Sequence, residues 1–529
     1  MKRLALAIAI ATAAPAFAGS VVVAKHAAIA TASPYATQIG LDVLKRGGNA
    51  IDAAVAVAFA LAVARPDSGN IGGGGFLVYY EASTHAVWTL DFREVAPADA
   101  KRDMFAKGRS SRDGALAAGV PGTVAGLAEM HQRFGTRSWK ELVAPAVELA
   151  RNGVKISDDL TSAATTAKAE RQIDFVPQAS PFVQKELAGT LQRIADKGAG
   201  DFYDGEIAAR IVESVRAAGG IISLRDLRDY KPVWRAPIRI AFRDFDVYTL
   251  PPPSAAGMML SEELNILSGF DLKATGYQTA STIHLIAEAS RRAAIDRDRY
   301  LGDPTTSRTP YRDLFSTARA AQWRASINPT RATPTISLTE PSSTIAQSLH
   351  TTHFTIADEE GNIAAITTTL GDDFGSGLVV KRCGFLLNNA MHDFATGDIS
   401  PNAIASGRRM ATSLAPAIIL RRNRPYLALG TAGGNAIPNI VLQTFLNVAI
   451  FGKSIADAVA APRYDQQAAP EDITCERATS PELVRSQLQM MGHGYRLSES
   501  IGDVHAIFFE PGRLTAVSDP RHGGAAGGY

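Results

Sequence analysis

The sequence predicts an α+β fold, and three observations lead to this class. Two strand-like runs, 354–357 and 363–370, are rich in β-branched residues and flank the polar turn 358–362. Residues 76–80 and 86–92 form a second predicted hairpin. Residues from about 120 to 350 are predicted to be mainly helical, with loops at 251–254 and 302–304.

The length and composition indicate a large folded protein. A chain of 529 residues exceeds a single typical core, so it should contain two or more lobes or one large layered domain. Its 46% hydrophobic and 20% charged residues are typical of soluble globular proteins rather than of disordered chains.

The first 18 residues have the three parts of a secretory signal. Lys2 and Arg3 precede a short apolar run, 4–11, and Ala16-Phe17-Ala18 resembles a cleavage site. We therefore expect a periplasmic or secreted protein that is cut after Ala18. Without residues 1–18 the basic and acidic residues balance, which favours neither nucleic acid nor an anionic membrane as a partner.

The sequence predicts no membrane span, metal site or cofactor. The longest later apolar run, 53–64, suits a buried core helix better than a bilayer span. The ten histidines are scattered, without the spacing of metal ligands. Cys383 and Cys475 could pair in an oxidising compartment, but two cysteines are also a common accidental count, and the sequence leaves both outcomes open.

Two helices and a run of glycines begin the chain. Ser33 and Pro34 predict a helix start, Gly47-Gly48 predicts its end, and a second helix should begin at about Ala50. Gly72–Gly75 then enter a strand. This order of helix, glycines and strand is not that of a nucleotide-binding loop, and close backbone packing beside a site is the favoured interpretation.

Thr351, at the start of the Thr-rich hairpin, is the candidate nucleophile. If the strands pair symmetrically about Glu360, Thr351 lies opposite Thr369, unless a bulge shifts the register. Threonine is also common on ordinary sheet surfaces. Catalysis would require cleavage of the His350–Thr351 bond, because the free α-amine of Thr351 could then act as its own base.

Two further motifs have residue types suited to amide chemistry. Arg93, at a strand end, has a planar guanidinium shaped for a carboxylate, although a surface ion pair is the usual role of such a residue. Gly433 and Gly434 lie between a predicted strand, 426–429, and a helix from about Pro438. Adjacent glycines there can direct two N–H groups at an oxyanion, or simply form a tight turn.

The chain closely resembles the gamma-glutamyltransferase (gamma-glutamyltranspeptidase) family. The resemblance extends over nearly the whole chain after residue 18. It rests on ordered motifs, among them GGNAIDAAVAVAFALAV, NIGGGGF, DFREVAP, GVPGTVAGL, TTHFTIADEEGN, FLLNNAMHDF, GTAGGN and SDPRHGGAAGGY.

The resemblance implies an N-terminal nucleophile hydrolase fold, a four-layer αββα sandwich of two stacked, mainly antiparallel sheets. It implies a precursor that cuts itself between His350 and Thr351 into subunits 19–350 and 351–529, which remain together as a heterodimer. It also implies a γ-glutamyl donor and an amino acid or peptide acceptor. The implied roles are nucleophile for Thr351, assisting hydroxyl for Thr369, oxyanion donors for Gly433 and Gly434, α-carboxylate contacts for Arg93, Thr412 and Ser413, and α-ammonium partner for Asp393.

Two positions depart from the family pattern. The family commonly has Asn where this chain has Gly371, and Glu or Gln where it has Ala390. Each missing hydrogen bond to a charged substrate group costs roughly 1.5 to 3 kcal/mol, so the departures affect substrate binding more than chemistry. Asp372 and Asp373 could compensate or select another amine.

The leading interpretation is an exported γ-glutamyl hydrolase and transferase for glutathione-like amides. A related cephalosporin or glutaryl-type acylase is the nearest alternative, favoured by Gly371 and Ala390. A non-catalytic periplasmic binding protein on the same fold is a second alternative. A nucleotide-binding protein built on Gly72–Gly75 is a third alternative.

Overall fold

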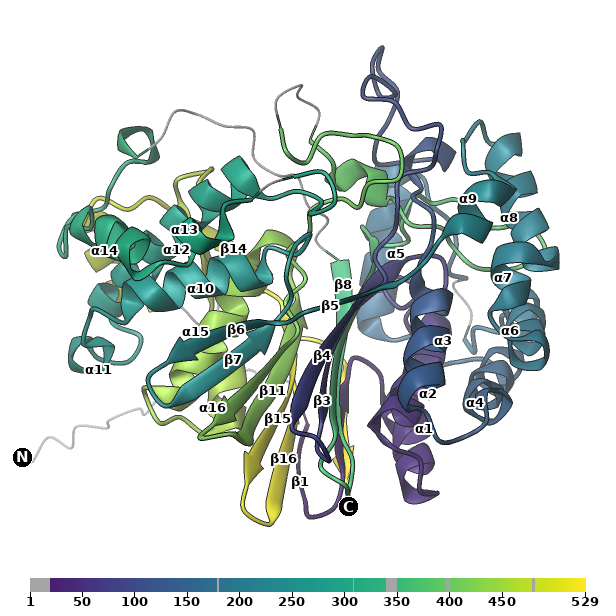
Figure 1. The fold of residues 1–529 in the computed structure, drawn as a ribbon, viewed down its shortest axis with the longest axis horizontal. Coiled ribbons are helices and arrows are strands. Elements are labelled where there is room, and N and C mark those ends of the chain that lie inside the picture. Colours follow the sequence, from purple (N-terminus) through teal and green to yellow (C-terminus); the bar gives the residue numbers. More distant parts are fainter. Residues whose placement is uncertain (1–19, 178–179, 308, 339–349, 396–399, 478–480) are drawn as a thin grey trace, which may run out of the picture.

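Two stacked sheets lie between two groups of helices and form four layers (Figure 1). The computed structural model describes residues 20–177, 180–307, 309–338, 350–395, 400–477 and 481–529. The predicted signal segment, 1–18, and most of the approach to Thr351, 339–349, lie outside these residues. The predicted αββα sandwich is confirmed.

The first sheet contains the hairpin of Thr351 at its centre. All its neighbouring strands pair antiparallel. Their order is β17 (Ala525–Gly528), β2 (Ala28–Thr31), β8 (His350–Ala357), β9 (Ile363–Gly371), β3 (Gly74–Glu81), β4 (Ala86–Asp91) and β5 (Val233–Arg235). Segments from both ends of the chain therefore belong to the same sheet as this hairpin.

The second sheet stacks on the first and is also antiparallel throughout. Its order is β1 (Val21–Ala24), β16 (Arg513–Ser518), β15 (Asp503–Glu510), β11 (Arg424–Ala432), β10 (Ala417–Arg421), β7 (Phe245–Thr249) and β6 (Ile238–Phe242). A small third sheet contains β12 (Tyr464–Asp465), β13 (Ile473–Glu476) and β14 (Tyr495–Ser498).

One group of helices covers the first sheet. Their apolar faces share a core with Leu77, Phe354 and Ile366 of that sheet. The group comprises α1 (Pro34–Lys45), α2 (Ala50–Ala64), α3 (Thr123–Phe134), α4 (Trp139–Asn152), α6 (Lys185–Lys197) and α8 (Glu206–Ala217), with α5 (Asp158–Arg171), α7 (Gly200–Asp204) and α9 (Leu224–Asp229) beside them.

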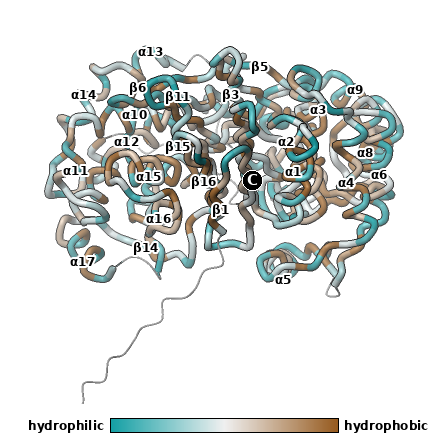
Figure 2. The backbone as a smooth tube through the Cα atoms, turned by 90° about the horizontal axis from the view of Figure 1, so that it is seen from below, coloured by the Kyte–Doolittle hydropathy of each residue, from teal (hydrophilic) through white to brown (hydrophobic). Residues whose placement is uncertain are grey.

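The other group of helices covers the second sheet, on the opposite side of the strands (Figure 2). Its helices pack on Ile418, Leu429 and Ile507 of that sheet. The group comprises α10 (Ala256–Leu267), α12 (Ala280–Tyr300), α15 (Ile437–Ala449) and α16 (Ile455–Ala460), with α11 (Leu272–Thr275), α13 (Tyr311–Leu314), α14 (Thr317–Ala325) and α17 (Glu482–Met490) at the periphery.

Strand β8 separates apolar from polar residues between its two faces. Phe354 and Ile356 belong to the helix-side core. The Thr355 hydroxyl, on the opposite face, donates to the His505 carbonyl of β15 at 2.9 Å. His353 faces the same way, because a Cβ on Gly430 of β11 would lie 2.4 Å from its ring. Thr351 shares cavity linings with Gly433 and Gly434, which follow β11, so the nucleophile candidate lies at the junction of the two sheets.

The predicted hairpin register is correct over most of its length. Pairs from Thr352–Thr368 to Ala357–Ile363 are symmetric about Glu360. A bulge lies at Thr351, because His350 pairs with Gly371 while Thr352 pairs with Thr368. Thr351 therefore faces two residues, Thr369 and Leu370, and the predicted one-to-one pairing of Thr351 with Thr369 is replaced by this bulge.

The first two helices begin where the sequence predicts. Helix α1 starts at Pro34, and α2 starts at Ala50 with a reciprocal capping box between Asn49 and Asp52. The prediction of a mainly helical segment 120–350 missed β5, β6 and β7. Strands β5 and β6 lie at sheet edges and β7 lies next to β6. All three are short, at three to five residues, although β6, Ile-Arg-Ile-Ala-Phe, shows the alternation typical of a strand.

Cys383 and Cys475 are free, and each is buried in a different hydrophobic core. Burial raises the pKa of both thiols, to about 11 for Cys475. In the part of the chain that the structure describes, no helix combines the length and apolar character needed to cross a membrane.

Candidate active site

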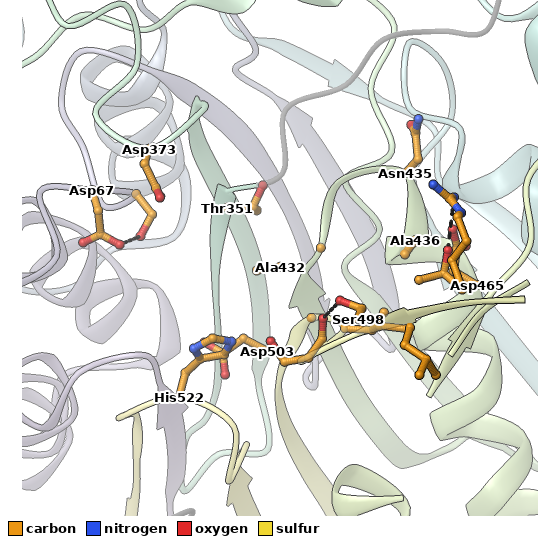
Figure 3. Close-up of a pocket in the computed structure, with 18 of the residues that line it drawn as sticks. Asp67, Thr351, Asp373, Ala432, Asn435, Ala436, Asp465, Ser498, Asp503 and His522 are labelled. Carbon is orange, nitrogen blue, oxygen red and sulfur yellow. Dashed lines mark hydrogen bonds between the residues drawn. The ribbon is translucent and has the colours of Figure 1, made fainter. Parts of the chain in front are cut away.

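Thr351 lines two cavities, and the lining of the larger one is drawn in Figure 3. It is the second residue of β8, at the end of the strand away from the hairpin turn, and it is buried, with 8% of its surface exposed. It is the one residue common to the linings of a small cavity of about 10 Å³ and a large cavity of about 610 Å³. The nucleophile candidate is therefore accessible from the large cavity.

The small cavity brings together residues from four separate segments that the sequence analysis singled out. Its lining consists of Thr351, Thr369, Gly371, Asp393, Thr412, Leu414, Gly434 and Ile437. The volume of about 10 Å³ leaves room for no more than one water molecule. In the uncut chain this pocket is therefore formed but closed.

The two candidate oxyanion glycines follow the strand that stacks on β8. Strand β11 ends at Ala432, and α15 begins at Ile437 after a short 3-10 turn. Gly433 and Gly434 have φ angles of +132° and +56°, which a side chain would strain. Gly433 lines the large cavity and Gly434 the small one, so the pair lies beside Thr351 on both sides.

Thr369 is held at the end of β9. Its hydroxyl accepts a hydrogen bond from the Gly371 N–H at 2.8 Å. This contact directs the hydroxyl toward the end of β9, beside the small cavity that Thr369 and Gly371 both line. The neighbouring glycines explain how β3 approaches β9 so closely, because a Cβ on Gly73 would lie 2.1 Å from the Thr369 carbonyl oxygen. The predicted role of the glycine run in close packing is confirmed.

Arg93 is fully buried behind the small cavity. Its guanidinium forms ion pairs with Asp393 at 2.8 Å and with Glu94 at 3.0 Å. Arg93 does not line the small cavity, whereas Asp393 does. Asp393 therefore separates the Arg93 guanidinium from the small cavity.

Burial dominates the electrostatics of these two carboxylates. It raises the pKa of Asp393 above its usual range, although the nearby Arg93 opposes the effect. Burial likewise raises the pKa of Glu94 to about 7, again against the charge of Arg93. Both shifts follow from removing a carboxylate from water.

Thr412 lines the small cavity, whereas the neighbouring Ser413 lines neither cavity. The Thr412 N–H donates to the Pro253 carbonyl at 3.0 Å, and the Ala255 N–H donates to the Thr412 carbonyl at 2.7 Å. The Ser413 hydroxyl donates to the Asn435 side-chain oxygen at 3.3 Å. The Pro-rich loop 251–254, identified only as a loop from the sequence, thus positions a wall of the site.

Comparison with known proteins assigns the chain to a family. Residues 36–529 match the family model for Gamma-glutamyltranspeptidase. The chain is 36% identical over 528 residues to the glutathione hydrolase proenzyme of Escherichia coli strain K12, covering 94% of this chain and 91% of that protein.

The chain belongs to the gamma-glutamyltranspeptidase family.

Acylases are also among its relatives. The acylase ACY 1 proenzyme of Pseudomonas sp. strain SE83 is 33% identical, over 93% of this chain and 91% of that protein. The crystal structure of cephalosporin acylase from Bacillus halodurans has a TM-score of 0.87 at 28% identity, with coverage of 96% of this chain and 97% of that one.

Of the two departures from the family pattern, Gly371 lines the small cavity and Ala390 does not. Gly371 has a φ of +99°, a conformation that favours glycine, and its lack of a side chain leaves no hydrogen-bond donor there. Ala390 is fully buried next to Met391 and Phe394. Neither residue can supply the polar contact that the family commonly has.

Asp372 and Asp373 point to different surroundings. The Asp372 carboxylate accepts hydrogen bonds from Arg112 at 2.5 Å and Asn389 at 3.1 Å. Although burial raises the pKa of Asp372, these contacts lower it overall. Asp372 is therefore held by Arg112 and Asn389. Asp373 lines the large cavity together with Thr351 (Figure 3).

The sequence analysis gave no role to two asparagines that hold the site together. Asn388 donates to the carbonyls of Gly72 and Gly119 at 2.8 and 2.9 Å. Asn389 accepts from the Asp372 N–H at 3.0 Å. Their presence in the motif FLLNNAMHDF was visible in the sequence, but their contacts are with distant segments.

One group of potential metal ligands appears only in three dimensions. Among the described residues, His284, Glu288 and His493 have ligand atoms within 4.8 Å of one another. His284 Nδ1 and His493 Nε2 are 2.7 Å apart, and Glu288 pairs with Arg292. These residues line neither cavity at Thr351.

Proposed function

We propose that this chain is an exported proenzyme that cuts itself before Thr351 and then hydrolyses or transfers γ-glutamyl groups from glutathione-like amides. As a member of its family it is an enzyme with γ-glutamyl transferase and hydrolase activity. The observation that carries the residue assignment is the meeting of Thr351, Thr369, Asp393, Thr412 and Gly434 at one small cavity.

The mechanism begins with the new α-amine of Thr351. Its unperturbed pKa of roughly 7.7 to 8.0 allows it to act as a base near neutral pH. The amine takes the Oγ proton as Oγ attacks the γ-amide carbonyl, and the N–H groups of Gly433 and Gly434 stabilise the oxyanion. Thr369 assists as a second hydroxyl.

Collapse of the tetrahedral intermediate breaks the carbon–nitrogen bond. The departing amine receives the proton held by the Thr351 ammonium, and the glutamyl group remains esterified to Oγ. Water or the amine of an amino acid or peptide then attacks this ester in the reverse sense. The products are free glutamate or a new γ-glutamyl amide, and Thr351 is restored.

We expect cleavage to precede substrate binding. His350 pairs with Gly371, which lines the small cavity, so the residue before Thr351 lies beside this pocket. A γ-glutamyl group does not fit in about 10 Å³. Breaking the His350–Thr351 bond would allow His350 to leave this position and would create the amine that the mechanism requires.

We assign the donor α-carboxylate to Arg93, Thr412 and Ser413, and the α-ammonium to Asp393. Binding of a zwitterion requires the Arg93–Asp393 pair to separate, so that each partner exchanges an internal ion pair for one with the substrate. The missing side chains at Gly371 and Ala390 weaken this recognition and keep a glutaryl-type acylase as a second candidate. No cofactor or metal takes part in this mechanism.

The N-terminal sequence of the purified protein tests the proposal. The expected products are two polypeptides, 19–350 and 351–529, of which the smaller begins Thr-Thr-His. Thr351→Ala should remain a single chain. A stable uncut wild-type protein would contradict the proposal. Turnover of γ-glutamyl anilide but not of glutaryl anilide supports the transferase, and the reverse result supports the acylase.

A further inference from the structure

Arg171, the last residue of α5, joins two loops that are far apart in the sequence. Its Nε donates to the Asp113 carboxylate at 2.7 Å, and its Nη1 donates to the Asp373 carbonyl at 2.8 Å. Its Nη2 donates to the carbonyls of Gly375 and Arg112 at 2.5 and 3.3 Å. The side chain is only 5% exposed. One buried guanidinium therefore connects the backbones of both loops.

The proposed cleavage would separate these two loops into different polypeptides. Helix α5 and residues 112–113 belong to the segment 19–350, whereas residues 373–375 belong to the segment 351–529. After cleavage, the position of one loop against the other depends on noncovalent contacts. A planar guanidinium, with five donors in a fixed geometry, is well suited to hold two backbones at a set distance.

The loop after β9 has a backbone that needs support from its surroundings. Phe374 and Gly375 have φ angles of +62° and +56°. For a residue with a side chain, such as Phe374, the left-handed conformation costs about 1 to 2 kcal/mol and persists only where neighbouring contacts enforce it. Phe374 is buried in a hydrophobic cluster with Leu160 and Ala167 of α5. Helix α5 therefore supports this loop by apolar packing and, through Arg171, by hydrogen bonds.

Helix α5 also contacts the segment 351–529 at its other end. Asp159, in the first turn of the helix, accepts a hydrogen bond from the Gly523 N–H at 2.6 Å and lies 3.5 Å from His522 Nδ1. His522 lines the large cavity. The helix is thus attached to that segment at both ends, and Arg171 makes the attachment beside the loop after β9.

The loop after β9 contributes to both cavities at Thr351. Gly371, the last residue of β9, lines the small cavity, and Asp373 lines the large one. Arg171 lines neither cavity, so it influences them only through the residues that it holds. A displacement of residues 372–375 would alter both cavities.

We propose that Arg171 is a positioning residue for the reaction at Thr351, because its hydrogen bonds hold the loop 372–375 where the two cavities are complete. This inference rests on the proposed function. The nucleophile and the oxyanion donors, Gly433 and Gly434, lie outside this loop. Loss of Arg171 should therefore weaken substrate binding more than it slows the chemical steps.

The kinetic constants of the mature enzyme for γ-glutamyl anilide test the proposal. Arg171→Ala should raise KM about 10-fold and leave kcat within about 3-fold of the wild type, because the binding space is altered while the reacting groups remain. Arg171→Lys should also raise KM, by about 3-fold or more, because one ammonium cannot reproduce the planar set of donors.

Added guanidinium ion supplies a readout that a general loss of stability would not reproduce. At about 10 mM, far below denaturing concentrations, guanidinium chloride should lower the KM of Arg171→Ala toward the wild-type value, because the free ion can donate to the same carbonyls. Sodium chloride at the same concentration should not lower it. The wild-type KM should change little in either salt.

Arg193→Ala is a matched control from the same layer of helices. Arg193 lies on α6 and forms a two-pronged pair with Asp201, with Nε–Oδ2 and Nη2–Oδ1 distances of 2.8 and 2.9 Å. It also pairs with Glu206 at 2.6 Å. These partners all belong to the segment 19–350 and line neither cavity at Thr351, so KM should stay within about 2-fold of the wild type.

Asp113→Ala provides a milder variant if Arg171→Ala does not fold. The Asp113 side chain is 43% exposed, and its removal takes away only the contact with Nε of Arg171. The remaining hydrogen bonds should then hold the loop less firmly, and KM should rise about 3-fold.

A wild-type KM in Arg171→Ala, or a loss of kcat at unchanged KM, would overturn the inference. Wild-type KM values in both Arg171→Lys and Asp113→Ala would overturn it as well, even if Arg171→Ala does not fold. If the wild type turns over only glutaryl anilide, the γ-glutamyl specificity of the proposed function is wrong, and the KM of the variants for that anilide decides the role of Arg171.

Discussion

Replacement of Glu263 by glutamine should make the protein less sensitive to alkaline pH. Glu263 lies on α10, fully buried, and burial raises its pKa from 4.5 to about 8. Asp465 adds to the rise, whereas Arg297 opposes it. Between these pH values the folded protein keeps the Glu263 proton while the unfolded chain releases it, so the free energy of unfolding falls as pH rises.

The magnitude follows from the two pKa values. Each unit of difference between the folded and unfolded states corresponds to about 1.4 kcal/mol, so the full loss approaches about 5 kcal/mol by pH 8. Above pH 8 the contribution becomes constant. Glutamine has nearly the same shape but no proton to release, so Glu263→Gln removes this part of the pH dependence.

Urea unfolding of the uncut Thr351→Ala chain is the appropriate assay, because a single polypeptide avoids subunit dissociation. The free energy of unfolding should be measured at pH 5.5, 7.0 and 8.5 and constant ionic strength. The decrease in the free energy of unfolding between pH 5.5 and 8.5 should be several kcal/mol smaller in the chain that also carries Glu263→Gln than in the Thr351→Ala chain alone. Equal declines in the two proteins would refute a protonated Glu263 in the fold.

Three other predictions concern the N-cap of α2, an acid-sensitive histidine and the acyl pocket. Asp52→Asn should destabilise the uncut chain by about 3 kcal/mol in thermal unfolding, because the Asp52 carboxylate accepts hydrogen bonds from the N–H groups of Asn49, Thr136 and Arg137. Asp42→Asn is the control and should change stability little, because it affects only an exposed contact with Gln38. Burial and the neighbouring His284 lower the pKa of His493 to about 4, so its contribution to stability is complete above pH 6.5 and is lost as pH falls toward 4. His493→Gln should therefore show a smaller acid-induced decrease in the free energy of unfolding. An unchanged decrease would contradict the assignment. Gly371→Asn should increase kcat/KM for γ-glutamyl anilide by about 10-fold, as expected for one hydrogen bond to a charged group. The positive φ of Gly371 should make the variant less stable by about 1 kcal/mol. A parallel gain with glutaryl anilide would show that the α-amino group is not involved.

Local patterns predicted most of the elements that surround the site. Pro34 and Asn49 begin helices because the N-terminal turn has unpaired N–H groups, a requirement that acts within a few residues. The hairpin about Glu360 has the predicted symmetry over most of its length, because its register is also set by residues close together in the sequence. Strands β6 and β7 were missed although they pair with each other as a local hairpin; only the pairing of β7 with β10 joins distant segments.

The sequence by itself determined the family, the α+β class and the identity of Thr351 as the candidate nucleophile, because ordered motifs and short-range patterns carry that information. Only the tertiary structure decided the bulge at Thr351, the pairing of Arg93 with Asp393 and the different surroundings of Asp372 and Asp373. Each of these depends on contacts between segments tens to hundreds of residues apart, where packing and burial set the distances and charges that no local pattern encodes.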